Sequence, residues 1–438
     1  DEFYDELASL FTAMANEDGP LPEWMTHSHG VTLYKNKGSR RDPANYRIIV
    51  MAPLFAKLYE KMLENRGRKL LAEGLLDIAG EQMGFMPQRS THDSMFILES
   101  LRDGQIKNKG KLFAAFLDLR KAFDTVSHKT FIKLLYDRGA PVDWIQQLTK
   151  MLANRKLKLL DALISLQVGT VQGSPISPLL FILFINPLIE RIKEAGKGVP
   201  FAGEGSTTTF IRCLLFADDV CLTAESIEDL ENMLEACRLW ASEFKMRFNA
   251  SKSEVLMLAG RLPEPRPPVH MGDEFVPWVK EVKYLGIPLK EGRRARLDPP
   301  KANMWGSYHR IKAALDPTLP IPVRNQLRLI ESDILSLALY PTPVKDTKYD
   351  EIDRFINRLL NRIAGTQQRW TSATFLRAEL GVWPSKFLAH RRALTYYWHL
   401  RQETWMGDLL SSLRGPGPME RFKSIAEKYG VSSQMQRR

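Results

Sequence analysis

Two adjacent carboxylates, Asp218 and Asp219, lie between two short apolar runs of this 438-residue chain. The flanking residues, 214–216 and 220–222, are of the types that fill buried strands, and neither Gly nor Pro separates them. This pattern predicts a tight hairpin with the aspartate pair at its turn. An isolated pair of this kind is often only a solvated turn, but two like charges held this close repel each other unless a cation lies between them.

A third carboxylate, Asp118, stands near the end of another apolar run, residues 112–119. A charged side chain at the end of a buried strand needs a partner or a metal ion. Pairing with a nearby arginine is the alternative to a metal site, and Asp124 is interpreted as a structural cap. If the strand ending at Asp118 lies beside the predicted hairpin, the three carboxylates form one site. The apolar helix predicted from residue 179 to 192 is then expected to pack beneath the sheet.

Basic and glycine-containing loops offer contacts for a phosphorylated ligand. Residues 31–38 are typical of a short strand that ends in a basic Gly turn, and three arginines follow closely. Lys and Arg beside such a turn suit a triphosphate, because they combine point charge with bidentate donors. In the loop 169–175, Gly173 lets the backbone approach a ligand, and Gln172 can donate and accept hydrogen bonds. Basic loops are also common on solvated surfaces.

Positive charge is concentrated in the last third of the chain. The net charge is +11, and from residue 301 onward 22 Lys and Arg face 12 Asp and Glu, a balance of +10. A basic lobe on a nearly neutral body is typical of a protein that binds a polyanion. Within it, Arg354, Arg358 and Arg362 are spaced i, i+4, i+8 and therefore share one helical face. A merely solvated face is the alternative.

Composition excludes several classes of protein. No apolar run reaches the roughly 18 to 20 residues that a membrane span needs, so no membrane partner is expected. The three cysteines fit neither a zinc spacing nor a disulfide framework, which indicates a reducing compartment. The chain begins at Asp1 without a signal peptide and can be an excised piece of a longer protein.

Helices and strands alternate up to about residue 299, and only helices are predicted beyond it. Ser90 and Thr91 are typical of a helix cap, with Asp93 in the first turn. One strand is predicted at 282–287. The helices expected in the last third span residues 303–315, 322–340, 348–364 and 384–402. The tail after residue 418 is predicted to hold one short helix and a frayed end.

Taken in order, these motifs resemble the reverse transcriptase domain of non-LTR retrotransposons. The likeness covers about residues 20 to 400, including helices at 303–364 and the stretch 379–384, which resemble the family's thumb. Two positions depart from the family pattern: Ile48 stands where Pro is usual, and Gln88 stands where Gly is common. The matching motifs are 33–37 with 45–47, 82–91, 115–124, 172–175 with 177–181, 216–219, 248–249 with 252–254, and 283–286.

The resemblance implies an α+β fold of the right-hand polymerase type. Its parts would be fingers with an N-terminal helix, a palm whose antiparallel sheet packs on helices and carries the catalytic hairpin, a helical thumb, and a C-terminal tail. The expected bounds are 1–113, 114–292, 293–402 and 403–438, respectively.

The resemblance also assigns roles to single residues. Asp118, Asp218 and Asp219 would bind two Mg²⁺ ions, for which Mn²⁺ can substitute, with Asp219 beside the ion that activates the primer. Lys252 would protonate the leaving pyrophosphate, although a surface lysine is the alternative. Residues expected to bind the nucleotide are Lys35 or Lys37 and Arg47 at the triphosphate, Gln172 and Gly173 along the pocket, and Phe123 against the sugar 2′ position. Residues expected to bind nucleic acid are Tyr284, Leu285 and Gly286 at the primer, and Arg354, Arg358 and Arg362 on the thumb.

The implied activity is RNA-directed DNA polymerisation by phosphoryl transfer from dNTPs to a primer 3′-hydroxyl. An RNA template, a DNA or RNA primer, target DNA and an endonuclease or nucleic-acid-binding domain in the same polyprotein are the expected partners. The expected compartment is nuclear or cytoplasmic, and nuclear during integration. Alternatives are a group II intron-like or domesticated cellular reverse transcriptase, and a catalytically silent RNA-binding scaffold. Phe216, where intron enzymes usually have Tyr, favours the retrotransposon branch, and the intact aspartates disfavour the scaffold.

Overall fold

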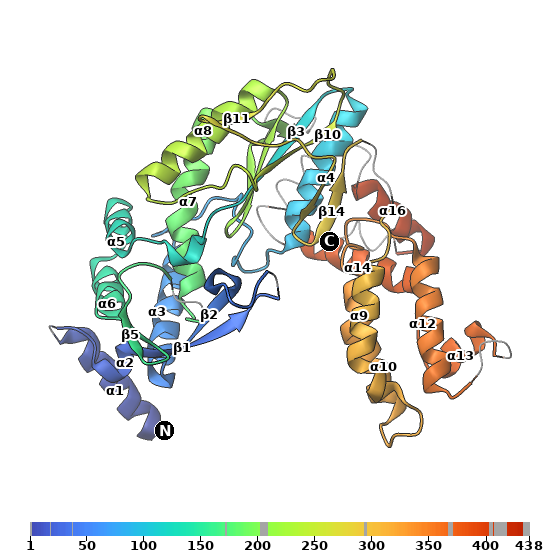
Figure 1. Cartoon of the computed structure of the whole chain (residues 1–438), viewed down its shortest axis with the longest axis horizontal. Coiled ribbons are helices and arrows are strands. Elements are labelled where there is room, and N and C mark those ends of the chain that lie inside the picture. Colours follow the sequence, from blue (N-terminus) through green and yellow to red (C-terminus); the bar gives the residue numbers. More distant parts are fainter. Residues whose placement is uncertain are drawn as a thin grey trace.

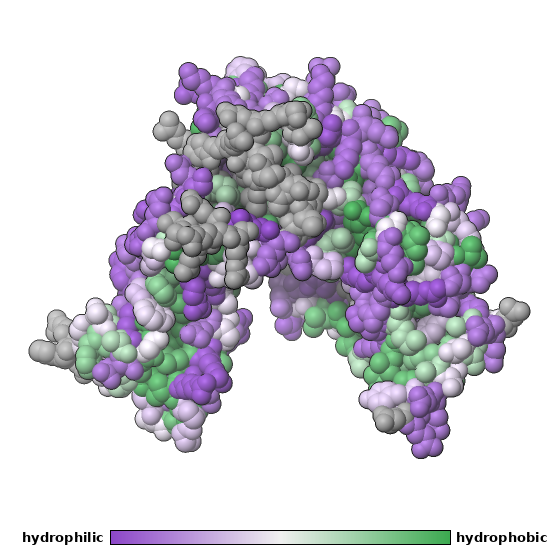
Figure 2. Space-filling view, turned by 180° about the vertical axis from the view of Figure 1, so that it is seen from behind, coloured by the Kyte–Doolittle hydropathy of each residue, from purple (hydrophilic) through white to green (hydrophobic). Residues whose placement is uncertain are grey.

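The chain folds into an arch with two limbs (Figure 1). Helices and strands from the N-terminal part build one limb, and helices from the last third build the other. In the space-filling view an open hollow separates the two limbs beneath the crown of the arch (Figure 2). This computed structural model describes residues 2–17, 19–36, 38–170, 173–201, 209–292, 296–366, 371–402, 406 and 418–431.

A four-stranded antiparallel sheet with the order β10-β3-β9-β8 forms the crown. Its central strand β3 is buried on both faces, which explains why its sequence is a continuous apolar run. One face packs with helices α7 and α8, and the other packs with α4. The predictions of the strand, the hairpin and the helix beneath the sheet are therefore confirmed. The bounds are β3 Leu112–Leu117, β8 Cys213–Phe216, β9 Asp219–Ala224, β10 Glu254–Ala259, α4 Thr91–Lys107, α7 Ser177–Ala195 and α8 Ile227–Glu243.

The first limb contains a second sheet with the order β2-β1-β4-β5. Strand β1 pairs antiparallel with β2 and parallel with β4, with His27 opposite Lys156. Two strands from the region expected to belong to the palm, β4 and β5, therefore share a sheet with two strands from the region expected to belong to the fingers. The bounds are β1 His27–Tyr34, β2 Tyr46–Met51, β4 Lys156–Leu159 and β5 Ala162–Ser165.

Helices fill the rest of this limb. A Cβ on Gly67 of α3 would lie 2.7 Å from both Trp144 and Leu179, so glycine is what lets α3 pack closely on its neighbours. The predicted cap of α4 is confirmed, because Ser90 and Asp93 form a reciprocal capping box. The bounds are α1 Glu2–Asn16, α2 Glu23–Thr26, α3 Leu54–Ala72, α5 His128–Asp137 and α6 Val142–Leu152, with short 3₁₀ turns at Pro43–Asn45 and Ala122–Asp124.

The second limb is helical, as predicted, and has its own apolar core. The helix expected at 322–340 contains a π-helical stretch, Ile330–Leu335, and the short helix α13 was not predicted. The bounds are α9 Lys301–Ile311, a 3₁₀ turn Lys312–Leu315, α10 Val323–Leu329, α11 Ser336–Ala338, α12 Tyr349–Ile363 and α13 Ala373–Glu379.

The last two described helices, α14 (Ser385–Leu400) and α16 (Pro418–Lys428), return to the crown. Phe422 of α16 stacks on Phe96 of α4 with ring centroids 6.0 Å apart, and the Tyr396 hydroxyl donates a 2.7 Å hydrogen bond to Asp93. The short helix expected in the tail is confirmed, and it belongs to the core that covers the sheet.

Three small hairpins complete the described part of the chain. The single strand expected at 282–287 is wrong: the segment forms a hairpin, because Leu285 and Gly286 take φ angles of 46° and 82° and reverse the chain. The bounds are β6 Val199–Phe201, β7 Thr209–Ile211, β11 His270–Met271, β12 Glu274–Phe275, β13 Glu281–Tyr284 and β14 Ile287–Lys290.

None of the described helices is long and apolar enough to cross a membrane. Cys213, Cys221 and Cys237 are buried free thiols, which agrees with the absence of a disulfide framework in the sequence.

Candidate active site

Strand pairing places Asp118 beside the aspartate hairpin. Leu117, the last residue of β3, pairs with Val220, so Asp118 follows one strand where Asp219 begins the other. Asp218 occupies the turn of the β8–β9 hairpin, directly after Ala217, which has a φ of 56°. Sequence analysis predicted this convergence, and the structure brings together strands that are one hundred residues apart.

A buried glutamine holds the turn in place. Gln82 is 0% exposed, and its Oε1 accepts hydrogen bonds from the backbone N–H groups of Ala217 (3.0 Å) and Gly84 (2.9 Å). The backbone on either side reinforces this contact, since the N–H of Met83 donates to Leu215 and that of Leu215 donates to Glu81. Sequence analysis did not identify Gln82 as a site residue.

Gly84 is also required by this packing. A Cβ added there would overlap the Ala217 nitrogen and lie 2.8 Å from the Phe216 carbonyl carbon. The backbone of the loop after Gln82 therefore lies directly against the turn that carries Asp218. A glycine next to a motif of this kind is the signal that could have revealed the contact.

The carboxyl groups of Asp218 and Asp219 are both perturbed by their surroundings. The pKa of Asp219 is raised to about 6, first by partial shielding from water and then by the charges of Asp218 and Asp118. The pKa of Asp218 is raised by the same shielding and by Asp118. Among the described residues, none of the three carboxylates has a cationic side chain within ion-pair distance, so their negative charge is not compensated.

This uncompensated charge fits the chemistry of a divalent cation, because Mg²⁺ prefers carboxylate oxygens. In the described part of the chain, however, no three His, Cys, Asp or Glu side chains are already grouped at metal-binding separations. The backbone brings the three aspartates to neighbouring positions, but their side chains do not converge on one point.

The loop that carries Lys252 supports the backbone at Asp118. The Ser253 hydroxyl accepts a 3.1 Å hydrogen bond from the Asp118 N–H, and the Asn249 N–H donates to the Asp118 carbonyl at 2.9 Å. Lys252 lies between these two residues and is exposed to solvent. The structure thus places Lys252 in the loop next to the aspartates.

Phe123, five residues after Asp118 in the sequence, belongs to an aromatic group. Its ring stacks on Phe181 with centroids 4.3 Å apart, and the exposed Phe85 meets it edge to face at 6.2 Å. Stacking on Phe181 of α7 fixes the Phe123 ring, which is partly buried. Phe85 was not predicted as a site residue.

The described residues expected to contact the triphosphate lie on or directly beside the β2-β1-β4-β5 sheet. Arg47 of β2 is exposed and pairs with Leu33, two residues before the exposed Lys35. Gly173 has a φ of 108°, and a Cβ there would lie 2.8 Å from the Val50 carbonyl oxygen, so its loop packs on β2. Lys37 and Gln172 lie outside the described residues.

The expected primer contact needs a correction at Tyr284. This side chain is 4% exposed and packs against Phe116 at 5.0 Å, so its ring belongs to the core and cannot reach a nucleic acid. Leu285 and Gly286 form the turn of the hairpin, and the Leu285 carbonyl accepts a 3.1 Å hydrogen bond from the Tyr340 hydroxyl. The turn, and not the tyrosine, is the part at the surface.

The predicted arginine row lies on α12. Arg354 and Arg358 are exposed and Arg362 is partly buried, while the opposite face of the helix is buried in the core of the limb.

The structure explains why glycine would suit position 88, where this chain departs from the family pattern. Gln88 takes a φ of 61°, a conformation that favours glycine.

The chain thus combines paired antiparallel strands, three aspartates at the ends of neighbouring strands and a helical limb. The family model described as reverse transcriptase (RNA-dependent DNA polymerase) matches residues 34–289. The chain therefore belongs to the reverse transcriptase family.

The curated relatives are proteins of non-LTR retrotransposable elements. The Pol polyprotein of element R2 from Nasonia vitripennis is 26% identical over 98% of this chain and 39% of its own length. The polymerase of the mobile element jockey from Drosophila melanogaster is 24% identical over 66% of this chain and 31% of its own length. The chain thus spans well under half the length of these relatives.

A solved structure of Candida albicans telomerase in complex with a fragment of telomeric RNA is similar at a TM-score of 0.41. The identity is 11%, over 94% of this chain and 68% of that chain.

Proposed function

We propose that the chain is the polymerase domain of a non-LTR retrotransposon protein and copies an RNA template into DNA from a primer 3′-hydroxyl. The observation that carries this proposal is that Asp118, Asp218 and Asp219 meet at the same end of the neighbouring strands β3 and β9, within a chain of the reverse transcriptase family.

Reverse transcriptases use divalent metal ions, and the three aspartates are the residues that would hold two Mg²⁺ ions here. When bound, such ions stabilise the attacking and leaving oxygens of an in-line displacement. The raised pKa of Asp219, about 6, supports this role, because a carboxyl destabilised by its neighbours gains most from a cation.

The residues around the aspartates would orient the nucleotide. Arg47 of β2 and Lys35, which directly follows β1, are exposed, and their charge would hold the triphosphate. Phe123, fixed by its stacking on Phe181, would stand against the sugar and exclude a 2′-hydroxyl by its bulk. Lys252 would donate a proton to the leaving pyrophosphate from the neighbouring loop.

The limbs would hold the template and primer between them. The arginine row on α12 offers phosphate contacts that are independent of sequence and weaken with salt. The turn at Leu285 and Gly286 would support the primer end.

We further propose that the whole protein primes on a nicked target DNA and carries an endonuclease or nucleic-acid-binding domain in the same polyprotein, and that it acts in the nucleus during integration. We propose the division into fingers, palm and thumb with the β4–β5 strands added to the fingers.

Primer extension tests the proposal. Purified chain with a primed RNA, dNTPs and Mg²⁺ is expected to synthesise DNA, and Asp218→Ala is expected to reduce the rate by about a hundredfold or more. Asp124→Ala is the matched control, because Asp124 is an exposed aspartate of the nearby 3₁₀ turn to which no metal is assigned. RNA binding without synthesis in the unaltered chain would refute the polymerase and favour a scaffold.

A further inference from the structure

A basic pocket lies where the second limb joins the crown, away from the aspartates. It is a cavity of about 460 Å³ bounded by the start of α12, by α14 and by α16. Seven of its lining residues carry basic side chains, and three carry carboxylates. The basic lining residues are Arg296, Lys348, Arg354, Lys386, His390, Arg421 and Lys428.

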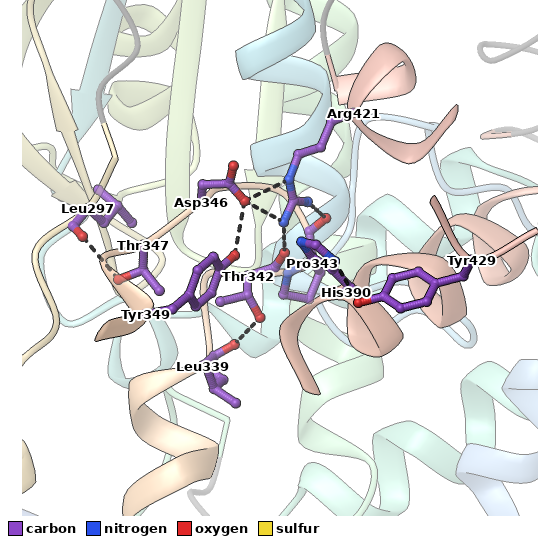
Figure 3. Close-up of polar contacts among 10 residues, drawn as sticks. All are labelled: Leu297, Leu339, Thr342, Pro343, Asp346, Thr347, Tyr349, His390, Arg421 and Tyr429. Carbon is purple, nitrogen blue, oxygen red and sulfur yellow. Dashed lines mark hydrogen bonds and ion pairs between the residues drawn. The ribbon is translucent and has the colours of Figure 1, made fainter. Parts of the chain in front are cut away.

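The floor of the pocket is built from a fixed arginine (Figure 3). The Arg421 guanidinium donates to Asp346 at 3.0 Å, to the Pro343 carbonyl at 2.9 Å and to the Thr342 carbonyl at 2.7 Å. The Tyr349 hydroxyl donates to the same Asp346 oxygen at 2.9 Å. These contacts neutralise Asp346 and hold α16 against the base of the limb.

Lys348 pairs with Asp298 at 2.6 Å, but other cations at the rim are not neutralised in this way. Arg296, Lys386 and Lys428 are exposed and form no ion pair among the described residues, and Arg354 donates only to the Asp350 carbonyl. Of the remaining lining acids, Glu351 is already paired with Lys301 at 2.8 Å. The pocket therefore carries excess positive charge.

The pKa of His390 is lowered in part by the positive charge of the pocket. It is buried, with its Nδ1 3.1 Å from the Tyr429 hydroxyl, and its pKa is lowered by burial and then by the positive charges of Lys428 and Arg421. Asp346 opposes the shift, but it does not cancel it. An anion bound among the lysines would relieve this repulsion.

The pocket continues the arginine row. Arg354 and Glu351 also line a smaller neighbouring hollow of about 300 Å³, together with Lys301, Trp305 and Arg358. Basic side chains thus run from Arg358 along α12, past Arg354, to Lys386 and Lys428. A single phosphate would use only part of a track of this length, whereas consecutive phosphates of one strand can occupy all of it.

We infer that this pocket binds phosphates of a single-stranded segment of RNA that extends beyond the duplex held between the limbs. The inference rests on the proposed function for the identity of the polyanion. The binding is electrostatic and independent of sequence, so it is expected to weaken steeply with salt.

The test compares three double variants in the whole chain, with a labelled oligouridylate strand as the probe. Lys386→Ala/Lys428→Ala removes the two rim lysines, and Lys386→Arg/Lys428→Arg keeps their charge. The matched control, Lys129→Ala/Lys133→Ala, removes two exposed lysines from α5 that also form no ion pair among the described residues. All six substitutions are at the surface, and thermal unfolding checks that each variant folds.

Loss of two single-strand phosphate contacts is expected to lower the slope of log affinity against log salt by about 1.4 and the affinity at low salt by about fivefold or more. The arginine variant and the α5 control are expected to bind like the unaltered chain. Primer extension on a template whose single-stranded part is limited to the few nucleotides being copied is expected to be unchanged in all three variants.

Two outcomes overturn the inference. One is equal RNA affinity and salt slope in the alanine variant and the unaltered chain. The other is loss of binding to inorganic phosphate alone, with RNA affinity intact, which would assign the pocket to a free anion. If the unaltered chain extends no primer, the polymerase proposal fails separately, and a lower RNA affinity in the alanine variant still supports the pocket.

Discussion

Replacing Gln82 with methionine tests whether one buried amide positions the catalytic turn. Methionine has a similar length and volume but offers no comparable acceptor. In Gln82→Met, the N–H groups of Ala217 and Gly84 both lose the oxygen that they share in the folded protein.

The magnitude follows from the burial of these groups. A buried donor left without a partner costs about 1 to 3 kcal/mol, so two donors cost about 2 to 6 kcal/mol if the turn stays in place. If the turn relaxes to recover part of this energy, Asp218 moves with Ala217. A displacement of about 1 Å at a catalytic group lowers the rate by about a hundredfold.

Stability and rate must therefore be measured together. Thermal unfolding gives the change in stability, single-nucleotide incorporation gives the rate, and titration of Mn²⁺ binding in the absence of nucleotide gives the affinity of the aspartates for metal. We expect lower stability, a rate reduced by about ten- to a hundredfold and weaker Mn²⁺ binding, because the turn that carries two of the ligands is displaced.

The matched control is Asn186→Leu. Asn186 is 1% exposed, and its Oδ1 accepts a 2.8 Å hydrogen bond from the Ala79 N–H, in the same loop but away from the turn. This change is expected to cost about 1 to 3 kcal/mol with little effect on Mn²⁺ affinity. The reasoning is refuted if Gln82→Met folds with normal stability and metal affinity, or if Asn186→Leu weakens metal binding as much.

Four further results are expected. Gly84→Ala places a methyl group on the Ala217 nitrogen and should reduce the rate of nucleotide incorporation, with a smaller loss of stability than Gln82→Met. Normal activity in this variant would contradict the close packing of the two loops. Metal affinity, measured with Mn²⁺ across a pH series, should rise by up to about tenfold per unit below pH 6 and level off above it, because the pKa of Asp219 is raised to about 6 and the bound ion displaces its proton. For the same reason the metal-free protein should lose stability as pH rises from about 4 through 6, since the folded state then gives up a proton that it holds more tightly than the unfolded chain; a gain over that range would contradict the shift. Arg421→Met should lower the free energy of unfolding by about 2 to 3 kcal/mol, measured by denaturant unfolding, because Asp346 loses its charged partner.

The aspartate site could be predicted because its signals are local. Two apolar runs around Asp218 specify a hairpin, and a single carboxylate closing a third run specifies the end of a neighbouring strand. The capping box of Ser90 and Asp93 is equally local, since its partners are three residues apart. The pairing of β3 with β9 then follows, because strands that are apolar on both faces are buried in the middle of a sheet.

The missed features depend on distant contacts or on single backbone angles. The parallel pairing of His27 with Lys156 joins two segments that are far apart in the chain, and no pattern in either segment indicates that they pair. The hairpin after Tyr284 looks like one strand until Leu285 adopts a positive φ. Gln82 gave no signal, because an amide is unremarkable in a loop until a turn from elsewhere in the chain is placed on it.

The return of α14 and α16 to the crown gives the helical limb two attachments. The chain enters the limb after β14 and leaves it through α14, and both connections rest on the core that contains α4. A body fastened at two points can swing about the line between them, but it cannot slide or twist freely. We therefore expect that this limb opens and closes along a single arc, so that its arginine row approaches or leaves a bound strand without losing its register.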